Sequence, residues 1–333
     1  MINLIDLKPS TISRNLKGKY MLIYGLPKVG KTTFASEIPG HLILSFEPGT
    51  NAMVGKMIQP IAKWVEFKQV LSQLRNPKVQ DKFDVICIDT ADKAYEACEK
   101  YVCQQNSVNQ LGEIPWGAGY SMCKKEFSDA FDEIAHLGYG LCFISHSTEK
   151  TFKDEKGDEY TQLAPALPQR PYDIINKLVD IIGYIRVKKD KETGDSIGRL
   201  YFRGDDNFLA GSRFKYIDES VLLSKNREFY YKNVEDAILK AIDQQVKMSG
   251  GQATDEHNRY FVNTEEEEKP NYEALMAEAK ELWGEIVKQD TTKAKAILDR
   301  VEKIFGKRMK ISEVTEDQVE LLPALLDEMK QLK

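Results

Sequence analysis

The sequence predicts an α/β fold in which helices flank a mainly parallel sheet, with a small helical module at the C-terminal end. Three observations predict it. Over roughly the first 240 of the 333 residues, short apolar runs alternate with amphipathic stretches, as in α/β domains. A glycine-rich phosphate-binding pattern lies between an expected strand and an expected helix. Beyond Ser249 the chain becomes polar, and its apolar residues then recur at helical spacing.

The expected strands are short segments rich in Ile, Leu, Val or Phe, as in strands that are buried on both faces. They cover residues 20–24, 41–46, 85–89, 141–145 and 181–187. The helices expected between them cover residues 31–37, 67–75, 91–105 and 122–137. A turn-rich K-E-T-G-D stretch within residues 189–198 predicts a connection between two antiparallel strands.

The pattern divides the chain into a core, a linker and a helical module. The α/β core is expected to cover residues 1–248. Residues 249–271 begin with S-G-G-Q and contain four consecutive glutamates, a polar composition that predicts a flexible acidic linker. Residues 272–333 form the module, with helices expected over 272–288 and 292–305. A third helix is expected to open at Thr315, which can form a capping box with Gln318.

The net charge of -5 is concentrated in the C-terminal part of the chain. Residues 249–333 carry 19 acidic and 13 basic side chains, so residues 1–248 are close to neutral. A neutral core can still bind a polyanion through a local groove, and the overall charge therefore excludes neither nucleotides nor nucleic acids. The acidic C-terminal part is typical of segments that contact partner proteins or compete with DNA.

The five cysteines form no C-x-x-C pair, which argues against a zinc site and predicts reduced, mostly buried thiols. The first ten residues include Asp6 and Lys8 and no apolar run of leader length. No segment reaches the ~18 uninterrupted apolar residues that a membrane span needs. We therefore expect a cytoplasmic protein without a membrane partner.

Residues 25–32 read G-L-P-K-V-G-K-T and match the phosphate-binding pattern G-x-x-x-x-G-K-[ST] in full. A chance match would occur in roughly one chain of this length in a hundred. The glycines let backbone N–H groups turn toward the phosphates, Lys31 reaches the β- and γ-phosphates, and Thr32 binds Mg²⁺. The sequence therefore predicts a site for ATP and Mg²⁺. The residues expected to contact the nucleotide are Gly25, Pro27, Lys28, Val29, Gly30, Lys31, Thr32 and Thr33.

A second metal-binding side chain is expected at the end of the strand over residues 85–89. Asp89 there matches the Walker B carboxylate, which holds Mg²⁺ together with the hydroxyl of Thr32. The alternative is a helix cap, because Asp89 or Thr90 could cap the helix that begins at Ala91.

Hydrolysis also needs groups that activate water and sense the γ-phosphate. Glu47 follows the second strand, expected beside the strand of the phosphate loop, and is the candidate base. Its alternative role is a polar residue leading into the Pro48–Gly49 turn. His146 follows the fourth strand and is the candidate sensor, the alternative being a histidine satisfied by backbone groups.

The order of these parts resembles the RecA-type ATPase core, and in particular the bacteriophage-type ATP-binding proteins grouped with the Sak single-strand annealing proteins. The resemblance covers roughly residues 15–245. It rests on residues 25–33, 45–50, 86–90, 116–120, 143–146 and 210–214. It implies a RecA-like P-loop core in which Glu47 is the catalytic glutamate and His146 is the sensor.

The resemblance also implies that Arg213 reaches the γ-phosphate of a neighbouring subunit. ATP would then lie between copies of the chain in a homo-oligomer, either a filament or a ring. Related sequences often carry a lysine near this arginine, whereas Ala210 and Gly211 stand here. Arg227 is a rival for the role, and a solvated surface arginine is the alternative reading of Arg213. The expected catalytic residues are thus Lys31, Glu47, Asp89, His146 and Arg213.

By the same resemblance, residues 106–119 and 147–170 correspond to two loops that face the filament axis and touch single-stranded DNA. The second is expected to be a long loop whose basic and aromatic side chains suit phosphate contact and base stacking. The acidic residues Asp154, Glu155, Asp158 and Glu159 weaken this interpretation. Those basic and aromatic side chains are Lys150, Lys153, Lys156, Arg170, Phe152 and Tyr160.

These expectations describe a DNA-stimulated ATPase that acts in recombination or annealing on single-stranded DNA. The C-terminal module would contact a single-strand-binding or recombination partner. Two other functions remain open from the sequence: a P-loop motor or loader in DNA replication or packaging, and a nucleotide-gated interaction protein. Strong stimulation of ATP hydrolysis by single-stranded DNA would argue against the last.

Overall fold

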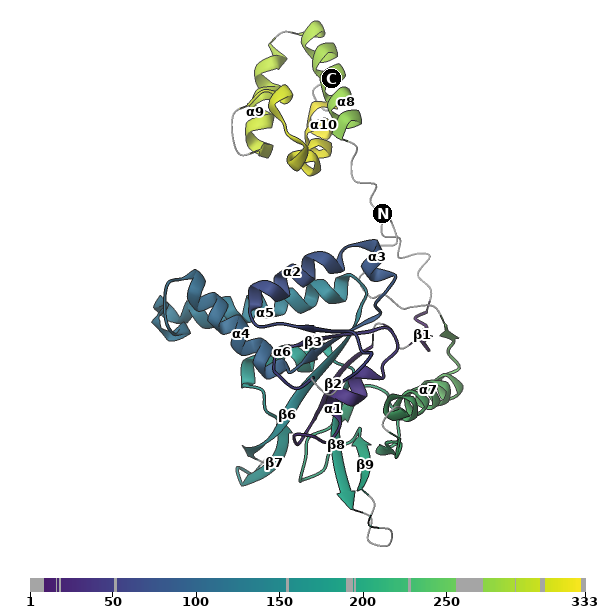
Figure 1. The fold of residues 1–333 in the computed structure, drawn as a ribbon. Coiled ribbons are helices and arrows are strands. Elements are labelled where there is room, and N and C mark those ends of the chain that lie inside the picture. Colours follow the sequence, from purple (N-terminus) through teal and green to yellow (C-terminus); the bar gives the residue numbers. More distant parts are fainter. Residues whose placement is uncertain are drawn as a thin grey trace. The chain divides into compact units, whose positions relative to one another are not determined.

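The computed structural model divides the chain into two compact units, residues 1–262 and 263–333 (Figure 1). The residues that it describes are 9–15, 17, 19–50, 53–153, 156–189, 194, 196–226, 229–255, 272–290, 292–305 and 309–330.

A ten-stranded sheet runs through the described part of the first unit, in the order β11-β9-β8-β2-β6-β5-β3-β4. Strands β10 and β7 pair with β8 and β6 outside this path. The six strands from β8 to β4 are parallel, whereas β9, β10, β11 and β7 pair in antiparallel fashion. Their bounds are β2 Tyr20–Gly25, β3 His41–Ser45, β4 Ile58–Pro60, β5 Val85–Asp89, β6 Gly140–Lys153, β7 Glu159–Pro165, β8 Ile181–Lys189, β9 Ser196–Tyr201, β10 Gly211–Ser212 and β11 Ser220–Leu222.

Helices cover both faces of this sheet, because its central strands are apolar on both sides. In β2, Leu22 and Tyr24 face one core, which α2, α4, α5 and α6 complete, while Met21 and Ile23 face a second core formed with α1 and α7. The mainly parallel, helix-flanked α/β fold predicted from the sequence is thus confirmed. The helix bounds are α1 Lys31–Ser36, α2 Trp64–Leu74, α3 Pro77–Gln80, α4 Ala91–Gln105, α5 Ala118–His136, α6 Gln169–Leu178 and α7 Tyr230–Ser249. All five cysteines are free and buried.

The segment 147–170 is not a long loop, contrary to the prediction. Strand β6 continues to Lys153 and forms a hairpin with β7, with seven residue pairs from Ser147–Pro165 to Lys153–Glu159. Helix α6 follows from Gln169. The prediction of this strand rested on a run of apolar residues that stops at Ser145. That run indicated only the part of β6 that is buried in the sheet. Beyond it, the backbone of β7 supplies the hydrogen-bond partners.

The core also continues past the predicted start of the linker at residue 249. Helix α7 ends at Ser249, and β12 (Ala253–Thr254) then pairs in parallel with β1 (Ile12–Ser13). This pairing brings together two segments far apart in sequence, which no local pattern could indicate. The rest of the predicted linker, residues 256–271, lies outside the described residues.

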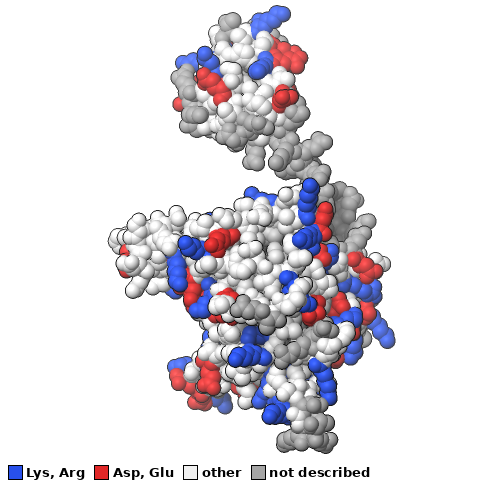
Figure 2. Space-filling view, in the orientation of Figure 1, with Lys and Arg blue, Asp and Glu red and all other residues white. Residues whose placement is uncertain are grey.

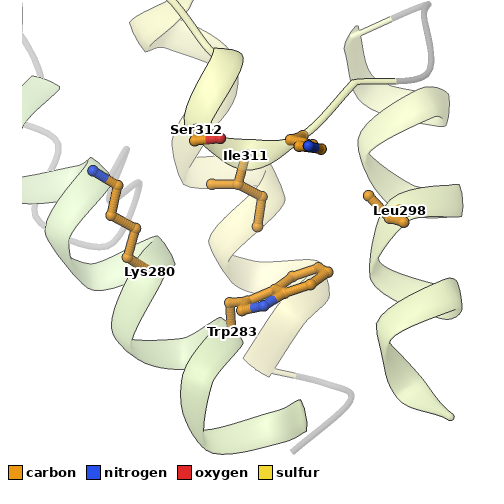
Figure 3. Close-up of a pocket in the computed structure, with 6 residues that line it drawn as sticks. Lys280, Trp283, Leu298, Ile311 and Ser312 are labelled. Atoms are coloured by element: carbon orange, nitrogen blue, oxygen red, sulfur yellow. The ribbon is translucent and has the colours of Figure 1, made fainter. Parts of the chain in front are cut away.

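In its described residues, the second unit has three α-helices around a core of its own. They are α8 (Tyr272–Gln289), α9 (Lys293–Phe305) and α10 (Leu322–Lys330). The capping box of Thr315 and Gln318 is present, but it opens a 3-10 turn over Glu316–Leu321 that precedes α10. A groove of about 370 Å³ beside the core is lined by Lys280, Trp283, Leu298, Lys310, Ile311 and Ser312 (Figure 3).

None of the helices in the described ranges is long and apolar enough to cross a membrane.

Truncation after residue 262 is expected to leave a folded core, because the first unit has its own hydrophobic cores. Truncation after residue 248 should lower the free energy of unfolding by about 1–3 kcal/mol. It removes the acceptors of two backbone hydrogen bonds, Ile12 N to Gln252 O (3.2 Å) and Arg14 N to Thr254 O (2.8 Å). Urea denaturation followed by circular dichroism, with nucleotide binding as a second readout, compares the two truncated chains. Aggregation of the 1–262 chain would show that the C-terminal module belongs to the core.

Candidate active site

The glycine-rich loop connects the end of β2 to the start of α1, at the edge of the sheet where the parallel strands end. Gly30 has a φ of 100°, and a Cβ there would lie 2.8 Å from the ring of Tyr230, so the position requires glycine. Lys28 also has a positive φ of 66°. Such left-handed turns let successive N–H groups converge on a phosphate.

Lys31 is buried at the start of α1, where its ammonium group donates hydrogen bonds to loop carbonyls. Nζ lies 3.0 Å from Gly25 O and 2.9 Å from Leu26 O. Burial lowers the pKa of this ammonium, while the negative charge of Asp89, first among three nearby carboxylates, opposes the shift. The loop thus holds a cation at its centre, beside the acidic end of β5.

Thr32 and Asp89, the two predicted Mg²⁺ ligands, are in direct contact. Thr32 Oγ1 donates a hydrogen bond of 2.7 Å to Asp89 Oδ2. Asp89 ends β5 and is only 5% exposed, and burial raises the pKa of its carboxyl group. A hydroxyl and a carboxylate oxygen are the hard ligands that Mg²⁺ takes from proteins, with nucleotide phosphates and water completing its shell. The residues present therefore fit Mg²⁺.

Glu47 lies two residues beyond β3, in a segment tied to the end of β5. Phe46 N donates to Asp89 O at 2.6 Å, and Ser45 Oγ donates to Glu47 O at 2.9 Å. The expectation that this strand lies beside β2 was wrong, because β3 pairs with β5 and β4, and β5 and β6 lie between it and the phosphate loop. Glu47 therefore follows a strand next to the one that bears Asp89.

His146 lies opposite Gly25 in the pairing of β6 with β2, so its strand runs between those that bear the phosphate loop and Asp89. Its Nε2 lies 3.2 Å from Glu47 Oε1, and the carboxylate accepts a hydrogen bond from that nitrogen. The candidate base and the candidate sensor thus meet at one point, although they are 99 residues apart in sequence.

Arg213 does not lie near the phosphate loop of its own chain. It follows β10, whose residues pair with Ile181 and Ile182 at the start of β8, whereas Gly25 pairs with Ile185. Its guanidinium forms an ion pair with Asp180 (3.2 Å) and donates to Lys177 O (2.6 Å). Action in trans therefore stays a prediction, and the rival Arg227 lies outside the described residues.

The two predicted DNA segments have defined structure. Residues 106–119 contain two 3-10 turns, Leu111–Glu113 and Pro115–Gly117, between α4 and α5, and Trp116 there is fully exposed. In the β6–β7 hairpin, Lys150 is engaged within the chain, because Nζ donates to Leu167 O at 2.6 Å and lies over the ring of Tyr172. Lys153 forms a 3.4 Å ion pair with Glu159.

Asp92 is a residue of the site that the sequence analysis missed. It lies in the first turn of α4, directly after β5, and burial raises the pKa of its carboxyl group. Its charge acts on Lys31, and the charges of His146 and Glu47 act on it. Its position in the sequence, three residues after Asp89, could have indicated this. The helix that follows β5 starts where the strand ends, so a side chain in its first turn lies close to Asp89.

Comparison with known proteins identifies relatives of this chain. The chain is 28% identical to the SPbeta prophage-derived uncharacterized protein YorG of Bacillus subtilis (strain 168), over 99% of this chain and 98% of that protein. Two solved structures align more weakly: the KaiC-like protein PH0186 of Pyrococcus horikoshii OT3 (TM-score 0.39, 10% identity, 64% of this chain and 88% of that one) and the flagellar accessory protein FlaH of Methanocaldococcus jannaschii (0.34, 11%, 62% and 85%). The description of the fold rests on the strand order given above and not on these two structures.

The model of the AAA domain family matches residues 17–214. This range covers more than half of the chain and contains the phosphate loop, Glu47, Asp89, Asp92, His146 and Arg213. The protein therefore belongs to the AAA domain family and is a P-loop ATPase of AAA type.

Proposed function

We propose that this ATPase acts in recombination or annealing by assembling on single-stranded DNA and hydrolysing MgATP between its copies. The observation that carries the proposal is the continuity of β6. The strand bears His146 at the nucleotide site and runs on without a break to Lys153 in the hairpin. A change at the γ-phosphate that moves His146 would therefore move the hairpin as well.

The chemistry at the nucleotide site would follow from the side chains that meet there. Glu47 accepts the proton of the attacking water, and its hydrogen bond with His146 fixes the direction of the carboxylate. Lys31 offsets negative charge on the β- and γ-phosphates. Mg²⁺, when bound, supplies further positive charge to the phosphates, and Thr32 and Asp89 hold it.

The hairpin offers a surface suited to unpaired bases. Phe152 and Tyr160 are directly opposite in the β6–β7 register, and their rings stack at 5.8 Å with an angle of 29°. Tyr160 is 40% exposed. Base stacking on such aromatic side chains contributes about 1–3 kcal/mol per base and tolerates any sequence. Basic and acidic side chains lie together at this end of the molecule, so stacking supports DNA binding better than charge does (Figure 2).

Hydrolysis between copies would place Arg213 of one copy at the phosphates of the next. Arg213 lies near the start of β8, at the opposite end of the parallel strands from its own phosphate loop. This position supports a role in trans. The ion pair with Asp180 must open in that step. The similarity to a prophage-derived protein supports a bacteriophage origin for this chain.

The double change of Phe152 and Tyr160 to Ala is expected to weaken single-stranded DNA binding by about tenfold or more, because both stacking surfaces are lost. Basal ATP hydrolysis should persist, since neither ring contacts the nucleotide site. Fluorescence anisotropy of a labelled oligonucleotide, measured with a non-hydrolysable ATP analogue, gives the affinity.

Trp116→Ala is the matched control, because it removes a fully exposed aromatic ring from the other candidate segment. A loss of affinity in this variant alone would move the DNA site to residues 106–119. Wild-type protein whose ATP hydrolysis does not respond to single-stranded DNA would instead favour the nucleotide-gated interaction protein. Electron microscopy of the same mixture distinguishes filaments from rings, and rings would favour the motor or loader.

A further inference from the structure

Unpartnered polar atoms gather at the end of β5 and in the adjacent middle part of β6. Within the described residues, six buried side-chain atoms have no hydrogen-bond partner, and four of them belong to this region. They are Thr90 Oγ1, Asp92 Oδ1, His146 Nδ1 and Ser147 Oγ. A buried polar atom without a partner costs about 1–3 kcal/mol and is rare in native proteins. A cluster of them therefore indicates a place built for water or for a ligand.

Asp92 is the charged member of this cluster. Thr90 directly follows β5, and Asp92 stands two residues later in the first turn of α4. The pairing of Asp89 with Ile144 brings the end of β5 beside the segment of β6 that leads to His146. The charge of Asp92 interacts with the charges of Lys31, Glu47 and His146. The Asp92 carboxylate is therefore electrostatically coupled to the nucleotide site.

The charge balance of the site favours a divalent cation there. Three carboxylates, Glu47, Asp89 and Asp92, act on the buried ammonium of Lys31. The exposed Lys93, which is paired with Glu96, also interacts with Glu47 and Asp92. Glu47 has the His146 ring as a partner, and Asp89 has the Thr32 hydroxyl. The Thr90 hydroxyl and the backbone N–H of Asp92 oppose the rise in the pKa of the Asp92 carboxyl, but its buried Oδ1 has no hydrogen-bond partner. Like charges in a buried site repel unless a cation offsets them.

An acidic side chain in the first turn of a helix is also favourable simply because the helix N-terminus is positive. That effect accounts for an aspartate at this position. It does not account for a buried oxygen that accepts no hydrogen bond, among three other buried atoms that also lack partners.

We propose that Asp92 is a positioning residue for Mg²⁺, whose Oδ1 accepts a hydrogen bond from a water molecule bound to the metal. Mg²⁺ releases its water reluctantly and binds proteins through one or two carboxylates plus substrate phosphates, so residues around it act largely through its water. Thr32 and Asp89 remain the direct ligands. The proposal rests on the MgATP site described above and adds to it the residue that orients the hydrated side of the metal.

The test is the Mg²⁺ dependence of nucleotide binding by the full-length chain, followed with a fluorescent, non-hydrolysable ATP analogue. Asp92→Asn is expected to need about tenfold more Mg²⁺ than the wild type for the metal-dependent gain in affinity, whereas binding of the analogue in EDTA should not weaken, because no metal is bound there. Asp92→Ser should show the same shift, because serine keeps a helix-start acceptor without the charge. Glu96→Gln, an exposed change one turn further along α4, should behave as the wild type.

Several results would contradict the proposal. A wild-type Mg²⁺ dependence in both Asp92 variants would overturn it. The same holds if thermal stability falls while the Mg²⁺ dependence is unchanged, because the carboxylate would then serve only the helix. Wild-type protein that binds no analogue at any Mg²⁺ concentration would refute the nucleotide site itself, a result distinct from a failure of Asp92 alone.

Discussion

Lys31→Ala is expected to weaken MgATP binding by about 100-fold and to reduce ATP hydrolysis to background, because it removes the charge that bonds the β- and γ-phosphates. The fold should survive. Burial of the ammonium group lowers its pKa, so the charged form is destabilised where it lies. Its hydrogen bonds go to carbonyls of the same loop, so its loss breaks no hydrogen bond with the rest of the core. Binding of a fluorescent ATP analogue and release of phosphate measure the two effects, and circular dichroism checks the fold.

Lys28→Ala is the matched control for this change. It removes the same charge from the same loop, at a position whose positive φ is equally unfavourable for lysine and alanine. We expect a much smaller loss of affinity, because the mechanism assigns the phosphate charge contact to Lys31. Equal effects of the two changes would mean that the overall charge of the loop, and not the position of Lys31, determines binding. Wild-type turnover in Lys31→Ala would refute the phosphate-binding role of Lys31.

Glu47→Gln is expected to bind MgATP nearly as tightly as the wild type but to hydrolyse it about 10²- to 10⁴-fold more slowly. Glutamine has the same shape, and its Oε1 can still accept the hydrogen bond from His146 Nε2, so the geometry of the site should be retained. What is lost is the carboxylate that takes the proton from water. Single-turnover hydrolysis separates this chemical step from binding. If the variant turns over at the wild-type rate, another group is the base, and Asp92, whose carboxylate interacts with Glu47, is the next one to test.

Much of the fold could be predicted from local patterns. The bounds of α4 and β5 agree with the prediction, and those of α1 and β3 differ by one residue, because a run of buried apolar side chains or a helical repeat is a property of neighbouring residues. The hairpin after Ser145 could not be predicted in this way. Most residues of this hairpin are polar and lie outside the core, although β7 ends in the buried Ala164 and Pro165. The structure of the two strands comes from pairing with each other, which no run of apolar residues marks.

In the candidate site, too, local motifs indicated some residues, whereas others depend on the order of the strands. The phosphate loop and Asp89 could be identified because each is a short motif whose neighbours fix its conformation. The contact of Glu47 with His146 and the inclusion of Asp92 depend on which strands are adjacent, and the expected neighbour of β3 was wrong. Strand order is set by packing between segments many residues apart. Local patterns in one amino-acid sequence therefore say little about it.

Local spacing in the sequence was enough to predict an α/β core, a glycine-rich loop between a strand and a helix, a carboxylate at a strand end and a helical C-terminal module. Long-range packing was needed to show that Glu47 follows the strand beside the one that bears Asp89 and that His146 bonds to Glu47. It also brings Asp92 to the site and places Arg213 near the start of β8, away from the phosphate loop. The physical reason is the parallel sheet. It gathers the ends of strands that are distant in sequence at one edge, and only the order and register of those strands decide which side chains meet there.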